Sequence, residues 1–270
     1  GRVHTWFDLP GYPEMGFNSM GDGYGRGMDC VKRTQLELLE VGPRFRQGKP
    51  QELWLDGRLI TREQWPTHPA NPFPEAWRKA MPWEVVPRMV TQANRLRDFT
   101  AWLDPANHAL DVSLNRFLGE QGLSQEAIRL ANDVSPGYGI NSFDLSTLML
   151  DFTDGFTRQQ IAAGPKSWAI KGGNQRLPEA MAKQLKDEVR LGQEVVAIDS
   201  GADGVTVTCA DGSLHRATHA ICSLPFSGLR NLRLTPAPGG SQARAIATLP
   251  YQPLSMAFLT AKKPFWDDDG

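Results

Sequence analysis

The length, composition and charge of the chain set broad limits on what it can be. It has 270 residues, of which 40% are hydrophobic and 22% are charged, so it can bury a core and is not disordered by composition. Its formal net charge of −1 gives no electrostatic reason to expect nucleic acid or an anionic membrane as a partner. No apolar run is long enough to cross a bilayer.

The reactive side chains do not fall into a familiar catalytic or metal-binding pattern. Cys30, Cys209 and Cys222 are odd in number and lack metal-ligand spacing, so we expect buried free thiols and no metal site. The five histidines are scattered and form no acid–base pair, and the chain lacks Ser-His-Asp order, H-E-x-x-H and a P-loop. Any chemistry is therefore expected to come from a cofactor.

The first 60 residues predict a turn, a helix and a hairpin. The glycine-rich stretch 21–27 has neither the spacing of a phosphate-binding loop nor a preceding strand, so it is predicted to be a flexible turn into a helix. Over 52–60, Asp56-Gly57 lies between two apolar runs and predicts a hairpin. The apolar side of the helix is expected to include Met28, Val31, Leu36 and Leu38.

The middle of the chain is predicted to be mainly helical. Prolines and tryptophans are dense over 61–83, which predicts an irregular connection. This connection is either a lid or a packed surface loop, and the second interpretation is favoured. Apolar periodicity predicts a helix over 86–103. Further helices are expected to begin near Asp111, at a Ser124 cap and in the polar set 142–146.

Residues 166–185 predict a strand, a turn and a helix. A strand over 166–170 leads to Gly172-Gly173, a pair that allows a tight turn and a close backbone approach. Asn174 can cap the helix that follows. One face of that helix is expected to carry Leu177, Met181 and Leu185.

The rest of the chain predicts mainly strands. Valine and isoleucine favour a strand over 195–198. Asp211-Gly212 predicts a hairpin between 205–209 and a second strand near 214–215. Residues 217–224 are apolar and are predicted to be a buried strand, and a further strand is predicted over 254–259.

The order of elements over 171–230 resembles the middle of the flavin-containing amine oxidases, the family of monoamine and polyamine oxidases. In that family a G-G-x-x-x-L-P-x-x-[LM] turn and helix precede a V-x-x-I strand, a D-G hairpin and a strand similar to A-I-C-S-L-P. The phrase S-L-x-x-F-L-x-x-x-G-L-S-x-E-A-I-R-L over 113–130 and K-x-P-F-W over 262–266 are also similar to family sequences. The alternative is that these turns and strands are common to many α/β proteins. That alternative is enough to explain the D-G hairpin taken by itself.

The resemblance implies a mixed α/β fold, in which an incomplete FAD-binding Rossmann-like domain carries an inserted substrate domain of helices and a mixed sheet. Residues 1–45 and 171–240 would belong to the FAD-binding domain. Residues 46–170 would form the mainly helical substrate domain, and 241–270 its sheet portion. The family's dinucleotide motif and C-terminal segment have no counterpart in the chain, so we expect a fragment that does not hold FAD tightly by itself.

The resemblance also assigns residues to the cofactor. Gly1, Arg2 and Val3 take the place of the end of the family motif G-G-R-V-x-T, in which the glycines admit the FAD and the arginine contacts it. The alternative for Arg2 is an exposed terminal arginine. Val195 takes the place of a valine whose backbone contacts the adenine end of FAD.

A second cofactor segment is implied by the sequence around Gly16. Gly16, Phe17, Asn18 and Ser19 resemble the stretch that passes the flavin ring. Phe17 stands where the family has a second glycine or another small residue.

Two strands are implied to face the substrate and the flavin. Lys166 and Trp168 take the place of cavity-wall residues, although an ordinary strand is the alternative. Met256 stands where many members have a lysine that holds a water near flavin N5 and assists reoxidation by oxygen. Methionine cannot donate that hydrogen bond. Either the oxidation half-reaction differs, another residue replaces the lysine, or the electron acceptor is not oxygen.

The activity implied by the resemblance is FAD-dependent oxidation of an amine or amino acid, with hydride transfer from its C–N bond to the flavin and an imine as product. The implied partner is a small-molecule amine, and no catalytic side chain is assigned. Another flavin oxidoreductase of the superfamily, such as a desaturase or protoporphyrinogen oxidase-like enzyme, stays open, as does a non-catalytic scaffold. The sequence does not indicate the substrate, the oligomeric state or the compartment.

Overall fold

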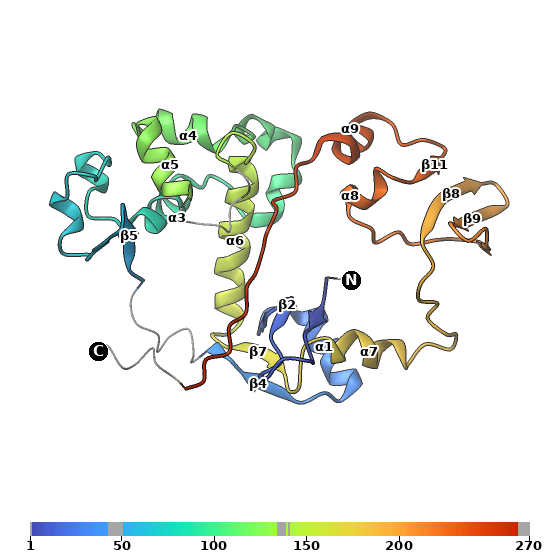
Figure 1. Ribbon diagram of the computed structural model, residues 1–270. Helices are drawn as coiled ribbons and strands as arrows, with labels where there is room; N and C mark the ends of the chain where they lie inside the picture. The colour runs from blue at the N-terminus through green and yellow to red at the C-terminus, as the bar shows by residue number, and fades with distance from the viewer. Residues whose placement is uncertain (1, 43–50, 134–138, 140, 264–270) are drawn as a thin grey trace. The chain divides into compact units, whose positions relative to one another are not determined.

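The computed structural model describes residues 2–42, 51–133, 139 and 141–263 (Figure 1). Residue contacts divide the chain into two units. The first unit comprises Gly1–Gln184 and Leu254–Gly270, and the second comprises Leu185–Pro253.

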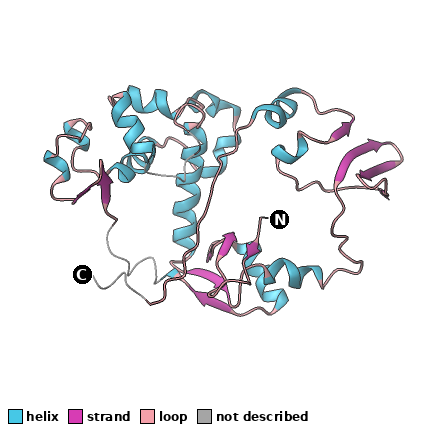
Figure 2. Cartoon of the chain, in the orientation of Figure 1, coloured by secondary structure: helices cyan, strands magenta, loops and turns pink. Residues whose placement is uncertain are grey.

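Four α-helices of the first unit surround its larger apolar core. They are α3 (Pro82–Ala93), α4 (Leu114–Glu120), α5 (Gln125–Asp133) and α6 (Thr147–Ala163), with short 3-10 turns η1 (Trp65–Thr67), η2 (Glu75–Trp77), η3 (Phe99–Leu103) and η4 (Pro105–Leu110) (Figure 2). Helix α3 packs against both α5 and α6, and α4 packs against α5. Trp65, Leu114 and Leu118 are completely buried in this core.

The predicted cap at Ser124 and the capped helix start predicted within 142–146 are confirmed, and the helix expected near Asp111 begins at Leu114, with Ser113 as its cap. Ser113 accepts a hydrogen bond from the backbone N–H of Arg116, and Ser146 caps α6. Ser124 accepts from the backbone N–H of Ala127 at the start of α5. Each cap satisfies an N–H group that the helix itself leaves without an acceptor.

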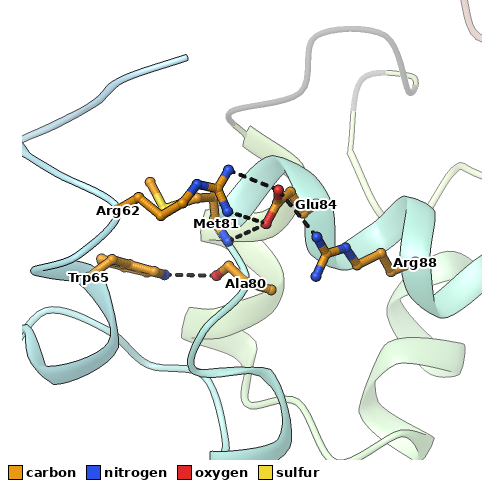
Figure 3. A network of polar contacts seen from close by, with 6 residues as sticks. All are labelled: Arg62, Trp65, Ala80, Met81, Glu84 and Arg88. Atoms are coloured by element: carbon orange, nitrogen blue, oxygen red, sulfur yellow. Dashed lines mark hydrogen bonds and ion pairs between the residues drawn. The ribbon is translucent and has the colours of Figure 1, made fainter. Parts of the chain in front are cut away.

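The start of α3 is fixed by Glu84 (Figure 3). Its Oε2 accepts from the backbone N–H of Met81 at 2.9 Å, and the guanidinium of Arg62 donates to both carboxylate oxygens at 2.9 and 3.0 Å. Arg88, one turn further along, lies 3.3 Å from the same carboxylate. These contacts hold the pKa of Glu84 below its ordinary value, chiefly through Arg62.

The predicted helix over 86–103 is wrong in its second half. Helix α3 ends at Ala93 because Asn94 leaves the helical conformation and uses its side chain elsewhere. The Asn94 amide donates to the backbone oxygen of Asp151 and to Asp154, and its oxygen accepts from the N–H of Leu96. The side chain thereby offers the backbone an alternative to the helix.

The proline- and tryptophan-rich connection over 61–83 is packed inward. Trp65 is 0% exposed and donates its indole N–H to the carbonyl of Ala80 at 2.8 Å, and Phe73 is 1% exposed. The favoured interpretation, a packed surface loop, is therefore correct in that the segment packs but wrong in placing it at the surface, because it supplies core residues. The predicted hairpin before it is also confirmed, as β5 (Leu53–Leu55) and β6 (Arg58–Ile60).

The sheet part of the first unit brings distant segments together. Strands β3 (Met20–Gly21) and β4 (Leu38–Glu40) flank the predicted strand β7 (Ser167–Ile170), and β1 (His4–Thr5) pairs with β2 (Glu14–Gly16). Helices α1 (Gly25–Thr34) and α7 (Arg176–Ala182) pack against each other. Their small apolar cluster contains Met20, Val31, Ile170 and Leu177.

Two helix predictions in this part are corrected. Helix α1 ends at Thr34, since Gln35 adopts a left-handed conformation, so Leu36 and Leu38 lie beyond it while still packing on the same cluster. Helix α7 ends at Ala182, so Leu185 lies outside it and is 60% exposed.

The second unit is built on a four-stranded sheet. Its strands are β8 (Val195–Gly201), β9 (Gly204–Cys209), β10 (Leu214–Ala217) and β11 (Arg233–Thr235), in the order β10-β9-β8-β11. Helices α8 (Phe226–Leu229) and α9 (Gly240–Thr248) complete it. The predicted strand at 195–198 and the Asp211-Gly212 hairpin are confirmed. Strands β8 and β11 run parallel, and the other pairs are antiparallel.

Two predicted strands are wrong. Residues 218–225 and 249–261 have no regular secondary structure, and Ile221 and Leu259 are 98% and 95% exposed. An extended apolar segment becomes a strand only where a neighbour accepts its hydrogen bonds, and no described strand pairs with either segment. Cys222 is consequently exposed, contrary to the expected burial, whereas Cys209 is buried.

None of the described helices has the length and hydrophobicity needed to cross a membrane.

Candidate cofactor site

Asn174 is the centre of a polar junction in the first unit. Its side chain is completely buried, accepts from the N–H of Ile170 at 2.8 Å, and donates to the carbonyls of Phe17 and Asn18 at 2.5 and 3.0 Å. The predicted capping role is wrong, because Gln175 occupies the cap position of α7. The Asn174 side chain instead joins the segment at 17–18 to the end of β7.

Thr5 and Glu14 continue this junction. Glu14 accepts from the backbone N–H of Asn174 at 2.7 Å and from the hydroxyl of Thr5 at 2.8 Å. The Thr5 hydroxyl accepts from the N–H of Gln175 at 3.0 Å, and the Gln175 side chain accepts from the N–H of Thr5 at 3.2 Å. We call Thr5, Glu14, Phe17, Asn18 and 172–175 the turn junction.

Two glycines, one in the turn junction and one beside it, allow neighbouring segments to lie in close contact. Gly173 has φ +109°, and a Cβ there would lie 2.6 Å from Cγ2 of Thr5. A Cβ on Gly16 would lie 2.3 Å from the backbone oxygen of Arg2. The close backbone approach expected at Gly172-Gly173 is therefore found, and the group that approaches is the chain itself.

The loop at 17–19 presents unused hydrogen-bond donors. Asn174 occupies the carbonyls of Phe17 and Asn18, whereas no described residue accepts from the backbone N–H of Phe17, Asn18 or Ser19. Asn18 is exposed and Ser19 half-buried, so these donors lie near the surface of the unit. Such a donor set fits an acceptor-rich group such as the pyrimidine edge of a flavin.

Phe17 departs from the family pattern in a way that the backbone explains. Its φ is +61°, in the left-handed region that glycine adopts without cost. Phe17 keeps this conformation while its ring packs on the cluster of Met20 and Ile170. The backbone shape typical of a small residue is therefore retained with a large side chain.

Lys166 and Trp168 lie on or beside β7, next to this loop. Trp168 pairs with Met20 across the β3–β7 ladder. Asp22 accepts from the indole N–H of Trp168 at 2.7 Å and from the backbone N–H of Lys166 at 3.0 Å. The ammonium of Lys166 lies 3.5 Å from Glu40 and 5.2 Å from the centre of the Trp168 ring.

The hydrogen bonds to Asp22 keep it ionised. The bond from Trp168 is the largest cause lowering the pKa of Asp22, followed by the backbone N–H of Lys166. Asp22 therefore fixes the orientation of the indole. The sequence predicted only a flexible turn here, since an aspartate between two glycines is a common turn signal.

The other assigned residues are distributed as follows. Arg2 is exposed and Val3 half-buried, just before β1, whereas Gly1 lies outside the described residues. Val195 begins β8 in the second unit. Met256 is 41% exposed in the irregular segment that replaces the predicted strand. The turn junction and β7 thus link five of the assigned residues: Arg2, Gly16, Phe17, Asn18 and Trp168. Three residues that organise this region were not assigned from the sequence: Thr5, Glu14 and Asp22.

Comparison with protein families shows the class to which the chain belongs. The model of the flavin containing amine oxidoreductase family matches residues 1–270, and the chain belongs to this family. Its members depend on FAD. The expected mixed α/β fold with a Rossmann-like part is likewise confirmed by solved structures.

Individual relatives cover parts of the chain. The flavin-dependent L-tryptophan oxidase RebO of Lentzea aerocolonigenes is 34% identical over 109 residues, which is 39% of this chain and 23% of that protein. An L-amino-acid oxidase of Protobothrops flavoviridis is 30% identical over 126 residues, 45% of this chain and 25% of that protein.

Solved structures match nearly the whole chain. Cyclohexylamine oxidase from Brevibacterium oxydans IH-35A superposes with a TM-score of 0.65 and 20% identity, over 92% of this chain and 55% of that one. Wild-type putrescine oxidase bound to putrescine gives a TM-score of 0.61 and 19% identity over the same shares. At these identities the likeness shows the fold alone. The chain spans about half the length of these structures.

Proposed function

We propose that the protein carrying this chain is an FAD-dependent oxidoreductase that oxidises the C–N bond of an amine or amino acid to an imine. The flavin, when bound, supplies the hydride acceptor. Family membership supports the reaction class. The observation in this chain that carries the proposal is the loop at 17–19: no described residue accepts from its N–H groups, while Asn174 binds the carbonyls of Phe17 and Asn18.

The cofactor-binding residues are proposed to act mainly through the backbone. The N–H groups of Phe17, Asn18 and Ser19 would donate to acceptor atoms of the flavin. Gly16 would let the start of the loop lie close to the backbone of Arg2. Arg2, which is exposed, would contact the cofactor by its guanidinium. Gly1, Val3 and Val195 are proposed contacts on the family pattern.

The domain assignment is proposed on the same basis. Residues 1–45 and 171–240 would belong to the FAD-binding domain, 46–170 to the helical substrate domain and 241–270 to its sheet portion. The division between the two contact units falls at different positions, at 184–185 and 253–254.

Lys166 and Trp168 are proposed to form part of the substrate-cavity wall. Asp22 would hold the Trp168 indole in one orientation, because it accepts the indole N–H, and the Lys166 ammonium rests over the ring. A fixed aromatic wall orients a substrate without losing side-chain entropy on binding. Both amines and amino acids stay within the proposal, since the relatives' names include oxidases of each kind.

A second candidate is another flavin oxidoreductase of the superfamily, such as a desaturase. It is favoured by Met256, which cannot donate the hydrogen bond that a lysine would provide near the flavin. A Met256→Lys variant should reoxidise faster in air than the wild type if the oxidase proposal holds. An unchanged reoxidation rate would favour an electron acceptor other than oxygen.

The test uses the protein expressed from its complete gene. Its visible spectrum is recorded without oxygen, before and after addition of a panel of amines and L-amino acids. We expect a flavin spectrum that bleaches with at least one of them. A flavin that no amine or amino acid bleaches would refute the substrate class, and the absence of flavin after reconstitution with FAD would leave a non-catalytic scaffold.

A further inference from the structure

Asp151 is a largely buried residue whose carboxylate receives no hydrogen bond from the described residues and keeps some contact with solvent. It lies on α6 and is only 8% exposed. Its backbone oxygen accepts from the amide of Asn94 at 2.9 Å, but no described residue donates to its carboxylate. Buried carboxylates ordinarily receive several hydrogen bonds, because leaving water without a replacement partner is costly.

Asp154, one turn further along the same helix, shows what a satisfied carboxylate looks like here. It accepts from the hydroxyl of Thr91 at 2.7 Å, from the amide of Asn94 at 2.8 Å and from Arg158 at 2.8 Å. Side-chain donors are therefore present around α6, and three of them bind the Asp154 carboxylate and none the Asp151 carboxylate. The Asp151 carboxylate can therefore still accept a hydrogen bond from a bound molecule.

The electrostatic state of Asp151 agrees with its surroundings. Burial, followed by the neighbouring charge of Asp154, raises the pKa of Asp151 to about 6, against the opposing effect of exposed Arg95. At neutral pH the carboxylate is ionised and incompletely compensated. A positively charged donor would supply both the missing hydrogen bond and the missing opposite charge.

A hollow of about 520 Å³ opens beside Asp151, between the ends of α3 and η4 and the helices α4 and α6. Its apolar lining includes Val90, Val112 and Phe117. Two arginines line it: Arg116 is paired with Glu120 at 2.8 Å, and exposed Arg95 acts on Asp151 through its charge without a hydrogen bond to the carboxylate. None of its lining residues is among those assigned to the flavin or to the substrate wall.

We infer that this hollow binds a small primary alkylammonium ion. The ammonium N–H groups donate to the Asp151 carboxylate, and the hydrocarbon chain lies against Val90, Val112 and Phe117. A divalent metal fits less well, because the described residues contain no group of three His, Cys, Asp or Glu side chains that could hold one. The inference does not depend on flavin binding or on oxidation.

The test measures the thermal unfolding midpoint of the full chain at pH 8, where Asp151 is ionised. Butylammonium chloride should give a saturable rise in Tm of about 2 °C or more over sodium chloride at equal ionic strength. Butyltrimethylammonium has the same charge but no N–H donor, and should not give this rise.

Two variants make the test specific. Asp151→Asn keeps the shape and removes the charge, and should abolish the butylammonium effect while remaining folded by far-UV circular dichroism. Glu126→Gln removes a negative charge from an exposed position on α5 and should leave the effect intact. A butylammonium shift that persists in Asp151→Asn, or that butyltrimethylammonium reproduces, overturns the inference, as does the absence of any shift in the wild type.

Discussion

The helical region around α3–α6 and the turn junction are held together by different interactions. In the helical region, side chains such as Trp65, Leu114 and Leu118 are completely buried among other apolar groups. In the turn junction, the completely buried side chains include the polar Asn174, and its partners lie up to 157 residues away in the chain. Apolar burial tolerates small adjustments, whereas a buried amide fixes its partners individually.

If the loop at 17–19 binds the flavin as proposed, the helical region mainly sets stability and the turn junction mainly positions the cofactor. The helical region needs a well-filled volume, which several apolar side chains can provide. The turn junction needs particular donors and acceptors in particular places, because it decides which backbone groups of the loop at 17–19 remain free. Changes in the two regions should therefore differ in size and in consequence.

The largest expected effect is that of Asn174→Leu. The leucine cannot bond to the N–H of Ile170 or to the carbonyls of Phe17 and Asn18, so one buried and two partly buried backbone groups lose their partner. We expect a loss of about 3–5 kcal/mol in the free energy of unfolding, measured with urea. Asn107→Leu removes one hydrogen bond, to Ala101, and should cost about 1 kcal/mol. Similar losses in the two variants would contradict the special role of Asn174.

Leu118→Ala tests the helical region. Leu118 is 0% exposed, so the truncation leaves a cavity and should cost about 3 kcal/mol, again by urea unfolding. Leu59→Ala, at a position that is 41% exposed, should change stability by less than about 0.5 kcal/mol. If the two variants were equally stable, the described packing of α4 would be wrong.

Asp151→Asn is expected to stabilise the chain, and only above acidic pH. The folded-state pKa of Asp151, about 6, is above the ordinary value of 3.8, so the folded state binds the proton more tightly. Wild-type stability therefore falls as the pH rises from about 4 to 6, while the variant lacks this loss. At pH 8 the gain should be about 1–3 kcal/mol.

The same variant supplies its own control. At pH 4 the Asp151 carboxyl is protonated in the folded state, so wild type and Asp151→Asn should have nearly the same Tm. A difference in Tm that does not change between pH 4 and pH 8 would show that burial does not raise the pKa.

The smallest expected effect is that of Glu84→Gln. The glutamine can still accept from the N–H of Met81 but loses the charge that pairs with Arg62 and Arg88. Because both arginines are about half exposed, we expect a loss of about 1 kcal/mol at pH 7, which 1 M salt should reduce.

The wild type tests the same interaction by titration. The pKa of Glu84 is lowered in the folded state, so its contribution is present above the ordinary value of 4.5 and disappears as the pH falls through the lowered pKa. The stability difference between wild type and Glu84→Gln should therefore vanish in acid. A difference that persists there would assign the effect to packing.

Local signals in the sequence predicted the elements that depend on neighbouring residues. The caps at Ser124 and Ser146, and the Asp56-Gly57 and Asp211-Gly212 hairpins, need only residues close by in the chain. The strands predicted over 217–224 and 254–259 failed because a strand also needs a partner, which local pattern does not reveal.

The candidate site was predictable by family resemblance and not by local pattern. The resemblance proposed the loop at 17–19 and the strand with Trp168 as parts of the site, and the structure added the contacts between them. Asn174 looked like a helix cap because an asparagine before a helix usually is one. Its buried role depends on Phe17 and Asn18, which are too distant in sequence for any helix signal to indicate.

The most direct test of the turn junction is FAD affinity in the protein expressed from its complete gene, measured by titrating the apoprotein and following flavin fluorescence. The variant is Asn174→Asp, which keeps the size of the side chain but has no donor for the carbonyls of Phe17 and Asn18. We predict at least about tenfold weaker FAD binding, equivalent to 1.4 kcal/mol, with an unchanged far-UV circular dichroism spectrum. Equal affinity in a folded variant would contradict the claim that Asn174 positions the flavin-binding loop.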